Sequence, residues 1–85
     1  MKADILYFAM LKDAVGRDRE TVEIPDTVVT VSDLLDFLAS RGEPFASALA
    51  NRKRVRCALD QEMAFPASDI RRVSEIALFP PVTGG

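Results

Sequence analysis

The chain has 85 residues, of which 48% are hydrophobic and 28% are charged, and its formal net charge is −2. This length supports one domain with a modest core and is too short for an enzyme with its own substrate chamber. The excess of acidic side chains argues against a nucleic-acid-binding protein, because such proteins usually carry a dense excess of lysine and arginine. We therefore expect a folded domain that acts together with a protein partner.

Two further features of the composition exclude common kinds of chemistry. The single cysteine, Cys57, rules out a disulfide within the chain, and the absence of histidine removes the commonest general base and metal ligand. The longest apolar run, from Ile5 to Leu11, is too short to span a bilayer and lacks the pattern of a signal peptide. We therefore expect a cytoplasmic protein that binds no metal, no nucleic acid and no membrane.

The first part of the chain predicts two strands separated by a short helical turn. Residues Lys2 to Met10 alternate only loosely, which is typical of a central strand that is covered on both faces. A helical turn around Leu11 to Val15 is expected to end at Gly16. The alternation of polar and apolar residues from Thr21 to Ile24 then predicts a half-buried second strand.

The clearest periodicity predicts a helix in the middle of the chain. Thr30 and Asp33 have the spacing of a capping arrangement at a helix N-terminus, and the pair Arg41-Gly42 suits a helix end. Between them, apolar residues recur at the spacing of one stripe of an amphipathic helix. The stripe consists of Val31, Leu34, Leu35, Leu38 and Ala39.

The second half of the chain predicts three strands. An alternating segment from Val55 to Leu59, a turn at Asp60-Gln61-Glu62 and a second strand from Met63 to Phe65 together read as a hairpin. The final strand, Val73 to Phe79, has Ile76 and Leu78 on one face. Its other face carries Glu75, Ala77 and Phe79.

This order of elements favours an α+β fold in which one main helix lies across one face of a mixed sheet. The arrangement is that of the β-grasp, or ubiquitin-like, roll. We assign residues 1–79 to the β-grasp domain and residues 80–85 to an extended, reactive C-terminal tail that the last strand delivers from its end.

The tail, Phe79-Pro80-Pro81-Val82-Thr83-Gly84-Gly85, is the most informative part of the sequence. Glycine lets a backbone pass where a side chain would collide, and two prolines favour an extended stem. From Pro80 onward the tail reaches at most about 20 Å, which is enough to enter a narrow tunnel in a partner. We expect Gly85, next to Gly84, to be the reactive centre, whereas the alternative interpretation is a frayed chain end.

The α-carboxylate of Gly85 needs activation, because an ionised carboxylate is inert toward acyl transfer. Attack of this carboxylate on the α-phosphate of ATP would give an acyl-adenylate. A sulfur nucleophile could then displace AMP and leave a terminal thiocarboxylate. The chemistry would therefore belong to the main chain rather than to a side chain.

Three other features have a structural and a functional interpretation. Cys57 sits on the apolar side of a predicted strand, which favours a buried, unreactive thiol. The basic cluster of Arg52 to Arg54 with Arg56 favours a solvated surface, with a contact to an anionic substrate as the alternative. Phe8, Met63 and Phe79 form either an exposed apolar patch that docks partners near the root of the tail or a set of partly buried residues.

The tail sequence after a β-grasp pattern of this length resembles the MoaD family, the small subunits of molybdopterin synthase. Weaker resemblance runs along the rest of the chain, in Ile5 to Ala9, Ala14 to Gly16, Thr30-Val31 and Leu59 to Gln61. One segment departs from the family, because Arg72 to Glu75 replaces the turn containing Gly-Asp that commonly precedes the last strand.

The resemblance implies a sulfur carrier for molybdenum cofactor biosynthesis. A ubiquitin-activating-type adenylating enzyme would use ATP to charge Gly85, a sulfurtransferase would convert it to a thiocarboxylate, and the large synthase subunit would accept the tail. There the sulfur would pass to a cyclic pyranopterin precursor. The resemblance also implies a heterotetramer of two small and two large subunits, in which the large subunits supply the catalytic side chains.

In that family the apolar surface near the tail contacts the partners, and Phe8, Met63 and Phe79 match its positions. The stem residues Pro80, Pro81, Val82 and Thr83 are expected to contact the partner along the tunnel. No cofactor is expected to be bound by this chain itself, since ATP would be bound by the activating enzyme.

Two alternatives share the first chemical step. A sulfur carrier for thiamine thiazole synthesis has the same fold and Gly-Gly end, but does not characteristically carry the Pro-Pro-Val stem. A ubiquitin-like protein modifier is the other alternative. All three interpretations predict an adenylated Gly85, so the acceptor separates them: a pterin, a thiazole precursor or a lysine on another protein.

Overall fold

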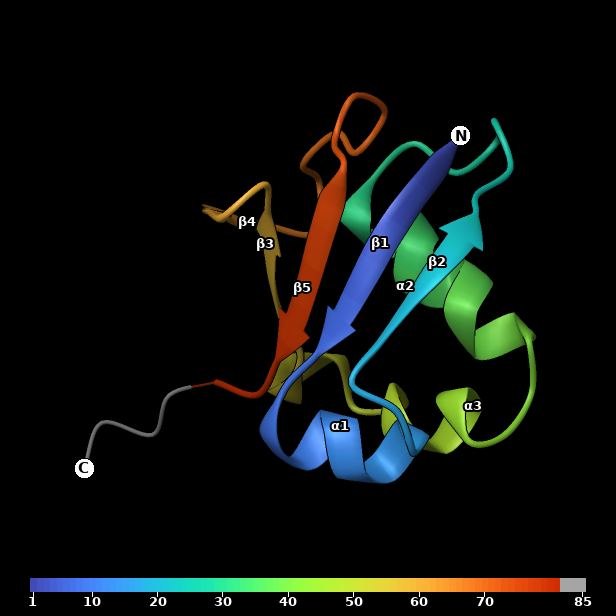
Figure 1. Cartoon of the computed structure of the whole chain (residues 1–85), viewed down its shortest axis with the longest axis vertical. Coiled ribbons are helices and arrows are strands. Elements are labelled where there is room, and N and C mark those ends of the chain that lie inside the picture. Colours follow the sequence, from blue (N-terminus) through green and yellow to red (C-terminus); the bar gives the residue numbers. More distant parts are fainter. Residues whose placement is uncertain (82–85) are drawn as a thin grey trace.

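A computed structural model describes residues 1–81 of the chain and shows a five-stranded sheet with helices on one face and at one end (Figure 1). Nine elements follow one another along residues 1–81. They are β1 (Lys2–Tyr7), α1 (Ala9–Val15), β2 (Arg19–Glu23), α2 (Val31–Ser40), α3 (Phe45–Ala48), the 3-10 helix η1 (Arg52–Arg54), β3 (Arg56–Leu59), β4 (Glu62–Ala64) and β5 (Glu75–Phe79).

The sheet is mixed, as predicted, and its strand order is β2-β1-β5-β3-β4. β1 pairs with β5 in parallel, whereas the β1–β2, β3–β4 and β3–β5 pairs are antiparallel. The last strand therefore lies in the middle of the sheet, with a hydrogen-bonded neighbour on each side. Because β5 is hydrogen-bonded on both sides, the position at which the tail leaves the sheet is well fixed.

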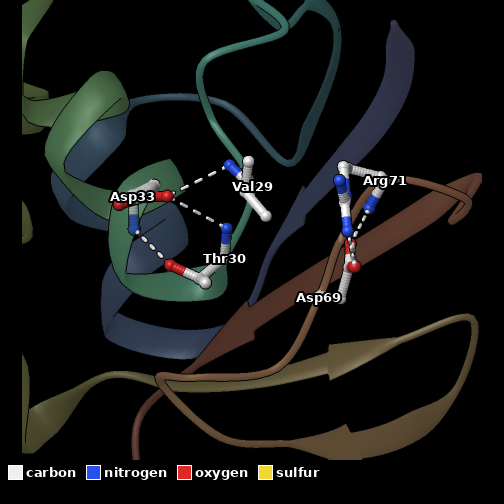
Figure 2. Close-up of polar contacts among 5 residues, drawn as sticks. All are labelled: Val29, Thr30, Asp33, Asp69 and Arg71. Carbon is white, nitrogen blue, oxygen red and sulfur yellow. Dashed lines mark hydrogen bonds and ion pairs between the residues drawn. The ribbon is translucent and has the colours of Figure 1, made fainter.

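The main helix, α2, confirms the sequence prediction in both its face and its caps. Thr30 Oγ1 accepts a hydrogen bond from the Asp33 amide at 3.1 Å, and Asp33 Oδ2 accepts from the Thr30 amide at 3.2 Å, which is a capping box (Figure 2). Hydrogen bonds from the backbone of Val29 and Thr30 hold the pKa of Asp33 below its usual value. Four of the five residues of the predicted stripe, Val31, Leu34, Leu35 and Leu38, are buried against the sheet, whereas the fifth, Ala39, is only partly buried.

The connection from β4 to β5 is fixed against the start of α2. The Val31 amide donates to the Ser68 carbonyl at 3.0 Å, and the Ile70 amide donates to the Val29 carbonyl at 2.9 Å. Next to this junction, Arg71 Nη2 forms an ion pair with Asp69 Oδ2 at 2.7 Å (Figure 2). Hydrogen bonds from Arg71 lower the pKa of the Asp69 carboxyl to about 2. This long connection is therefore held at several points before it enters β5.

The boundary between β1 and α1 differs from the prediction. We expected the first strand to reach Met10, but it ends at Tyr7, and α1 already begins at Ala9. The chain leaves the sheet because Ala9 adopts a positive φ of 52° and the Leu11 amide turns back to the Phe8 carbonyl at 3.1 Å. Apolar residues suit either element here, so the pattern could not separate them. The helix ends as expected at Gly16, whose φ of 77° suits glycine.

α1 and α3 lie at the end of the sheet where β1 and β5 finish, and α2 covers one face (Figure 1). Among residues 1–81, no helix has the length and apolar character needed to cross a membrane. The core lies between the sheet and the helices. Its fully buried large side chains are Tyr7, Ile5, Ile24, Leu34, Leu38, Leu49, Ile70, Ile76 and Leu78.

A polar cluster of Tyr7, Glu20 and Arg41 joins β1, β2 and the end of α2. The buried Tyr7 hydroxyl donates to Glu20 Oε2 at 2.7 Å, and Arg41 Nη2 donates to Glu20 Oε1 at 2.8 Å. The Arg41 guanidinium also lies 4.3 Å from the centre of the Phe45 ring. Burial favours a higher pKa for Glu20, but the hydrogen bonds from Arg41 and Tyr7 outweigh it, and the pKa is lowered.

Candidate functional site

The face of the sheet opposite α2, which we call the outer face, carries a row of apolar residues in register. Leu6 of β1 is paired with Ala77 of β5, Ala77 is paired with Ala58 of β3, and Ala58 is paired with Met63 of β4. Since side chains alternate along a strand, these four residues point away from the buried side chains of the same strands. The row crosses four neighbouring strands of the sheet.

A second row lies at the root of the tail. Phe79 is paired with Arg56 of β3, and the Phe8 amide donates to the Leu78 carbonyl at 3.0 Å, which brings Phe8 beside Phe79. Together the two rows form the outer-face patch, which we define as Leu6, Phe8, Ala58, Met63, Ala77 and Phe79. The structure thus brings the three predicted patch residues onto one face.

The outer-face patch is accessible to a partner. Met63 is 61% exposed and Phe8 is 46% exposed, whereas Phe79 is half-buried between its neighbouring strands. An exposed apolar surface of this kind is characteristic of interaction sites. Exposure of Phe8 and Met63 fits the expectation from the sequence, and a docking role for these residues stays a prediction.

A hollow of about 360 Å³ extends the patch toward α1. Leu6 and Phe8 form its apolar wall, and Lys12, Asp18 and Arg19 form its polar rim. Arg19 also holds Asp4 in an ion pair of 3.0 Å on the outer face. The patch therefore has an apolar centre with charged groups around it, which is the usual composition of a protein interface.

The tail begins directly at this patch. β5 ends at Phe79, and Pro80 and Pro81 follow it as half-buried residues outside any strand. The predicted reactive residues Gly84 and Gly85, and the predicted stem residues Val82 and Thr83, lie outside the described residues. The structure shows where the tail leaves the sheet, which is at the end of the central strand β5, next to Phe8 and Arg56.

The start of β5 is fixed by Asp60 in the β3–β4 turn. Asp60 Oδ1 accepts hydrogen bonds from the amides of Ser74 at 3.0 Å and Glu75 at 2.9 Å, and the Asp60 amide donates to the Glu75 carbonyl at 2.9 Å. Asp60 and Gln61 have φ values of 48° and 72°, as a tight hairpin turn requires. The segment that departs from the family pattern is therefore held by a side chain from the neighbouring hairpin.

Two side chains that could have supplied chemistry are engaged in the fold. Cys57 is 4% exposed, and burial raises the pKa of its thiol to about 12, so the reactive thiolate is almost absent at neutral pH. The Tyr7 hydroxyl is buried and bound to Glu20, and both effects raise its pKa. In residues 1–81 no group of three or more potential ligand side chains could hold a metal ion.

Several residues of the site were not identified from the sequence. Leu6, Ala58 and Ala77 form the middle of the outer-face patch, but small or ordinary apolar residues in strands give no functional signal by themselves. Arg56 was noted only as part of a basic cluster, and its place beside Phe79 depends on the pairing of β3 with β5. Strand alternation assigned Ala77 to the same face as Phe79, whereas the rows across the sheet require the register.

Comparison with known proteins finds a matching family model, relatives in sequence and similar solved structures. The model of the ThiS family matches residues 5–85. The molybdopterin synthase sulfur carrier subunit of Haemophilus influenzae is 33% identical over 82 residues, covering 96% of this chain and 98% of that protein. The protein of the same name from Escherichia coli is 32% identical over 81 residues, covering 95% and 96%.

Solved structures agree with these relatives. SAMP1 from Haloferax volcanii superposes with a TM-score of 0.73 at 28% identity, over the full length of both chains. A putative molybdopterin converting factor, subunit 1, from Pyrococcus furiosus has a TM-score of 0.71 at 23% identity, covering 96% of this chain and 99% of that one, and supports the fold alone. The predicted β-grasp fold is thereby confirmed, and the chain belongs to the ThiS/MoaD family of sulfur carriers.

Proposed function

We propose that this chain is the sulfur-carrying small subunit of a molybdopterin synthase, acting in the cytoplasm. The observation that carries the proposal is the exposed outer-face patch at the root of the tail, in a chain whose relatives are named as carriers for that synthase. A partner that covers Phe8, Met63 and Phe79 is thereby positioned to receive the residues that follow Pro81.

The proposed reaction uses the α-carboxylate of Gly85. Its oxygen attacks the α-phosphorus of ATP on an adenylating enzyme, pyrophosphate leaves, and an acyl-adenylate forms. The outer sulfur of a persulfide on a sulfurtransferase then attacks the carbonyl carbon and displaces AMP. A thiol cleaves the S–S bond of the resulting acyl disulfide, which releases the thiocarboxylate and leaves a disulfide on the donor. In the synthase, this sulfur is transferred to a cyclic pyranopterin precursor, and a carboxylate is regenerated on Gly85.

In this proposal residues 1–81 bind the partner and position the tail, and the chemistry takes place at the tail. Burial raises the pKa values of the Cys57 thiol and the Tyr7 hydroxyl, so neither group serves as an acid, base or nucleophile in the proposed transfer. The large subunit of the synthase supplies the catalytic side chains in the proposed heterotetramer. The fixed position of β5 and the two prolines lower the conformational-entropy cost of ordering the tail when it enters the tunnel of the large subunit.

Reconstitution with purified components tests this function. The chain is incubated with ATP, the adenylating enzyme and a sulfur donor, and its intact mass is measured for replacement of one oxygen by sulfur. The large subunit and the cyclic pyranopterin precursor are then added, and pterin sulfur transfer is measured. A chain that lacks Gly85 and a chain with one alanine added after it are both expected to be inactive.

A matched control is Ala50→Ser on the exposed surface after α3, which should keep full activity. If the chain without Gly85 still supported pterin sulfur transfer, the proposed function would be wrong. If the full chain were adenylated but transferred nothing to the pterin, a different acceptor would be indicated.

A second candidate is a ubiquitin-like protein modifier. It is favoured by the likeness to solved structures of SAMP1, one of which is titled small archaeal modifier protein 1 and has a TM-score of 0.67 at 27% identity. In that case the carbonyl of Gly85 would form an isopeptide bond with a lysine of another protein. Mass spectrometry of trypsin-digested cell extracts would then find lysines that carry residues 73–85, because Arg72 is the last trypsin site of this chain. A carrier for thiazole synthesis would instead give sulfur to a thiazole precursor in the same reconstitution.

A further inference from the structure

A groove lies between α2 and the β3–β4 hairpin, on the opposite side of β4 from the outer-face patch. Its volume is about 400 Å³, and its floor is apolar. Val31 and Leu35 line it from α2, and Cys57 and Ala64 line it from the hairpin. None of the chemistry proposed above uses this groove.

The rim of the groove carries two strongly exposed apolar side chains. Phe65 is 70% exposed and Met63 is 61% exposed, which are the largest values among the exposed large apolar residues within residues 1–81. Each such side chain could bury a substantial area against a partner. Because Met63 also belongs to the outer-face patch, the patch and the groove meet at one residue.

The groove also has a cationic side. Arg52 and Arg56 line it, next to the exposed Lys53 and Arg54 of η1. Arg52 Nη2 pairs with Asp36 at 2.8 Å, whereas Arg56 Nη1 donates to the carbonyls of Lys53 at 2.9 Å and Val55 at 3.3 Å and has no carboxylate partner within the described residues. A carboxylate from outside would therefore meet available positive charge.

The N-terminus of α2 does not compete for such a carboxylate. The amides of Val31, Ser32 and Asp33 already donate to the Ser68 carbonyl, the Pro66 carbonyl and Thr30 Oγ1. The available anion donors at this groove are thus the Arg56 guanidinium and the N–H groups of Arg52 that do not donate to Asp36 or to the Leu49 carbonyl. The apolar floor and the two arginines are therefore complementary to a partner segment in which an apolar residue is followed by an acidic one.

We propose that this groove binds an extended segment of the synthase large subunit, with an apolar side chain on the groove floor and a carboxylate at Arg52 and Arg56. The inference rests on the proposed function, since it extends the same interface around the edge of β4. A stable interface covers about 800 Å² and 20 to 30 residues on each partner, which is about a sixth of the 5157 Å² surface of this chain. The six residues of the outer-face patch and the six tail residues after Phe79 together fall short of that number, and the groove continues the patch.

Affinity for the large subunit, measured by titration calorimetry on the full chain, tests the inference. Phe65→Ala is expected to weaken binding at least tenfold, and Arg52→Gln about threefold with a smaller dependence on salt. The conservative changes Phe65→Leu and Arg52→Lys should bind within twofold of the wild-type chain. Thermal unfolding of each variant shows that the fold is kept, and the exposure of Phe65 favours this.

The outer-face variant Ala77→Lys separates the two proposals, because Ala77 does not line the groove. If Ala77→Lys abolishes binding while Phe65→Ala binds as the wild-type chain does, the groove inference is overturned and the proposed function stands. If the wild-type chain does not bind the large subunit, both fail.

Two further measurements use the wild-type chain. Hydrogen exchange in the complex should show protection at residues 31–35 and 62–66, and unchanged exchange there would contradict the inference. Sedimentation of the free chain should show a monomer at working concentrations. A dimer that Phe65→Ala dissociates would mean that a second copy occupies the groove, and this would also overturn the proposal.

Discussion

Ile76 and Ala77 are neighbours in β5, but their side chains lie on opposite faces of the sheet and have different roles. Ile76 is fully buried beneath the helices, where it joins the core with Ile5 and Leu78. Ala77 faces outward in the middle of the outer-face patch, between Leu6 and Ala58. The inner face is apolar because the domain must fold, and the outer face is apolar, in our proposal, because a partner must bind.

The difference teaches that stability and docking can be changed almost independently in this molecule. Successive side chains of a strand point to opposite faces, so a change at one position leaves the other face in place. Changes on the inner face should lower the free energy of unfolding, and changes on the outer face should lower affinity for a partner. The experiments below test this separation, from the largest expected effect to the smallest.

Replacement of Ile76 by alanine should have the largest effect on stability. The change removes a fully buried side chain and leaves a cavity in the middle strand, which is expected to cost about 3 kcal/mol of unfolding free energy. Urea denaturation followed by circular dichroism measures the loss. The conservative change Ile76→Val should cost about 1 kcal/mol. A full loss of partner affinity in the folded Ile76→Ala chain would contradict the separation of the two faces.

Replacement of Glu20 by alanine should cost about 2 kcal/mol, because the buried Tyr7 hydroxyl loses its acceptor and Arg41 loses its partner. The control Glu20→Gln keeps an acceptor oxygen for Tyr7 and should cost less. Denaturation at several pH values sharpens this prediction further.

The pKa of Glu20 is lower in the folded chain than its usual value of 4.5. A lowered carboxylate pKa contributes stability that is fully present above the unfolded-state value and is lost as the pH falls through the folded-state value. The stability difference between the wild-type chain and Glu20→Gln should therefore shrink as the pH falls below 4.5. A difference that stayed constant down to acid unfolding would show that the charge of Glu20 contributes nothing.

Replacement of Ala77 by lysine should leave the fold intact and disturb docking. The long side chain can extend into solvent in the free chain, so the free energy of unfolding should change by about 0.5 kcal/mol or less. In a complex it would place an unpaired charge in the apolar centre of the patch, and affinity for the large subunit should fall at least tenfold, about 1.4 kcal/mol. Ala77→Ser, a small polar replacement, should bind within threefold of the wild-type chain.

Among the three alanine replacements expected to destabilise the fold, Asp60→Ala should have the smallest effect, about 1 kcal/mol of unfolding free energy. The amides of Ser74 and Glu75 lose their shared acceptor at the start of β5. Asn is the matched control, because it keeps an acceptor oxygen and tolerates the positive φ of 48° at this position. If Asp60→Asn were as unstable as Asp60→Ala in urea denaturation, the hydrogen bonds would not be the cause.

The sequence predicted the local elements well where the residues themselves carry the signal. The stripe from Val31 to Leu38, the capping box of Thr30 and Asp33, and the hairpin turn at Asp60-Gln61 are all present. Each depends on residues within a few positions of one another, so local propensity is enough. The end of β1 was placed three residues too late, because Phe8 to Met10 suit either a strand or a helix.

By itself, the sequence determined the order of the five strands and of α1 and α2, the face of α2 and the burial of Cys57, since these follow from periodicity and capping, whereas the short helices α3 and η1 were not predicted. Only the tertiary structure decided that Leu6, Ala77, Ala58 and Met63 form one row, that Phe8 lies beside Phe79, and that Met63 joins the patch to the groove. The physical reason is that alternation gives a strand two faces, whereas the choice of neighbours and their register depends on contacts between residues far apart in the chain.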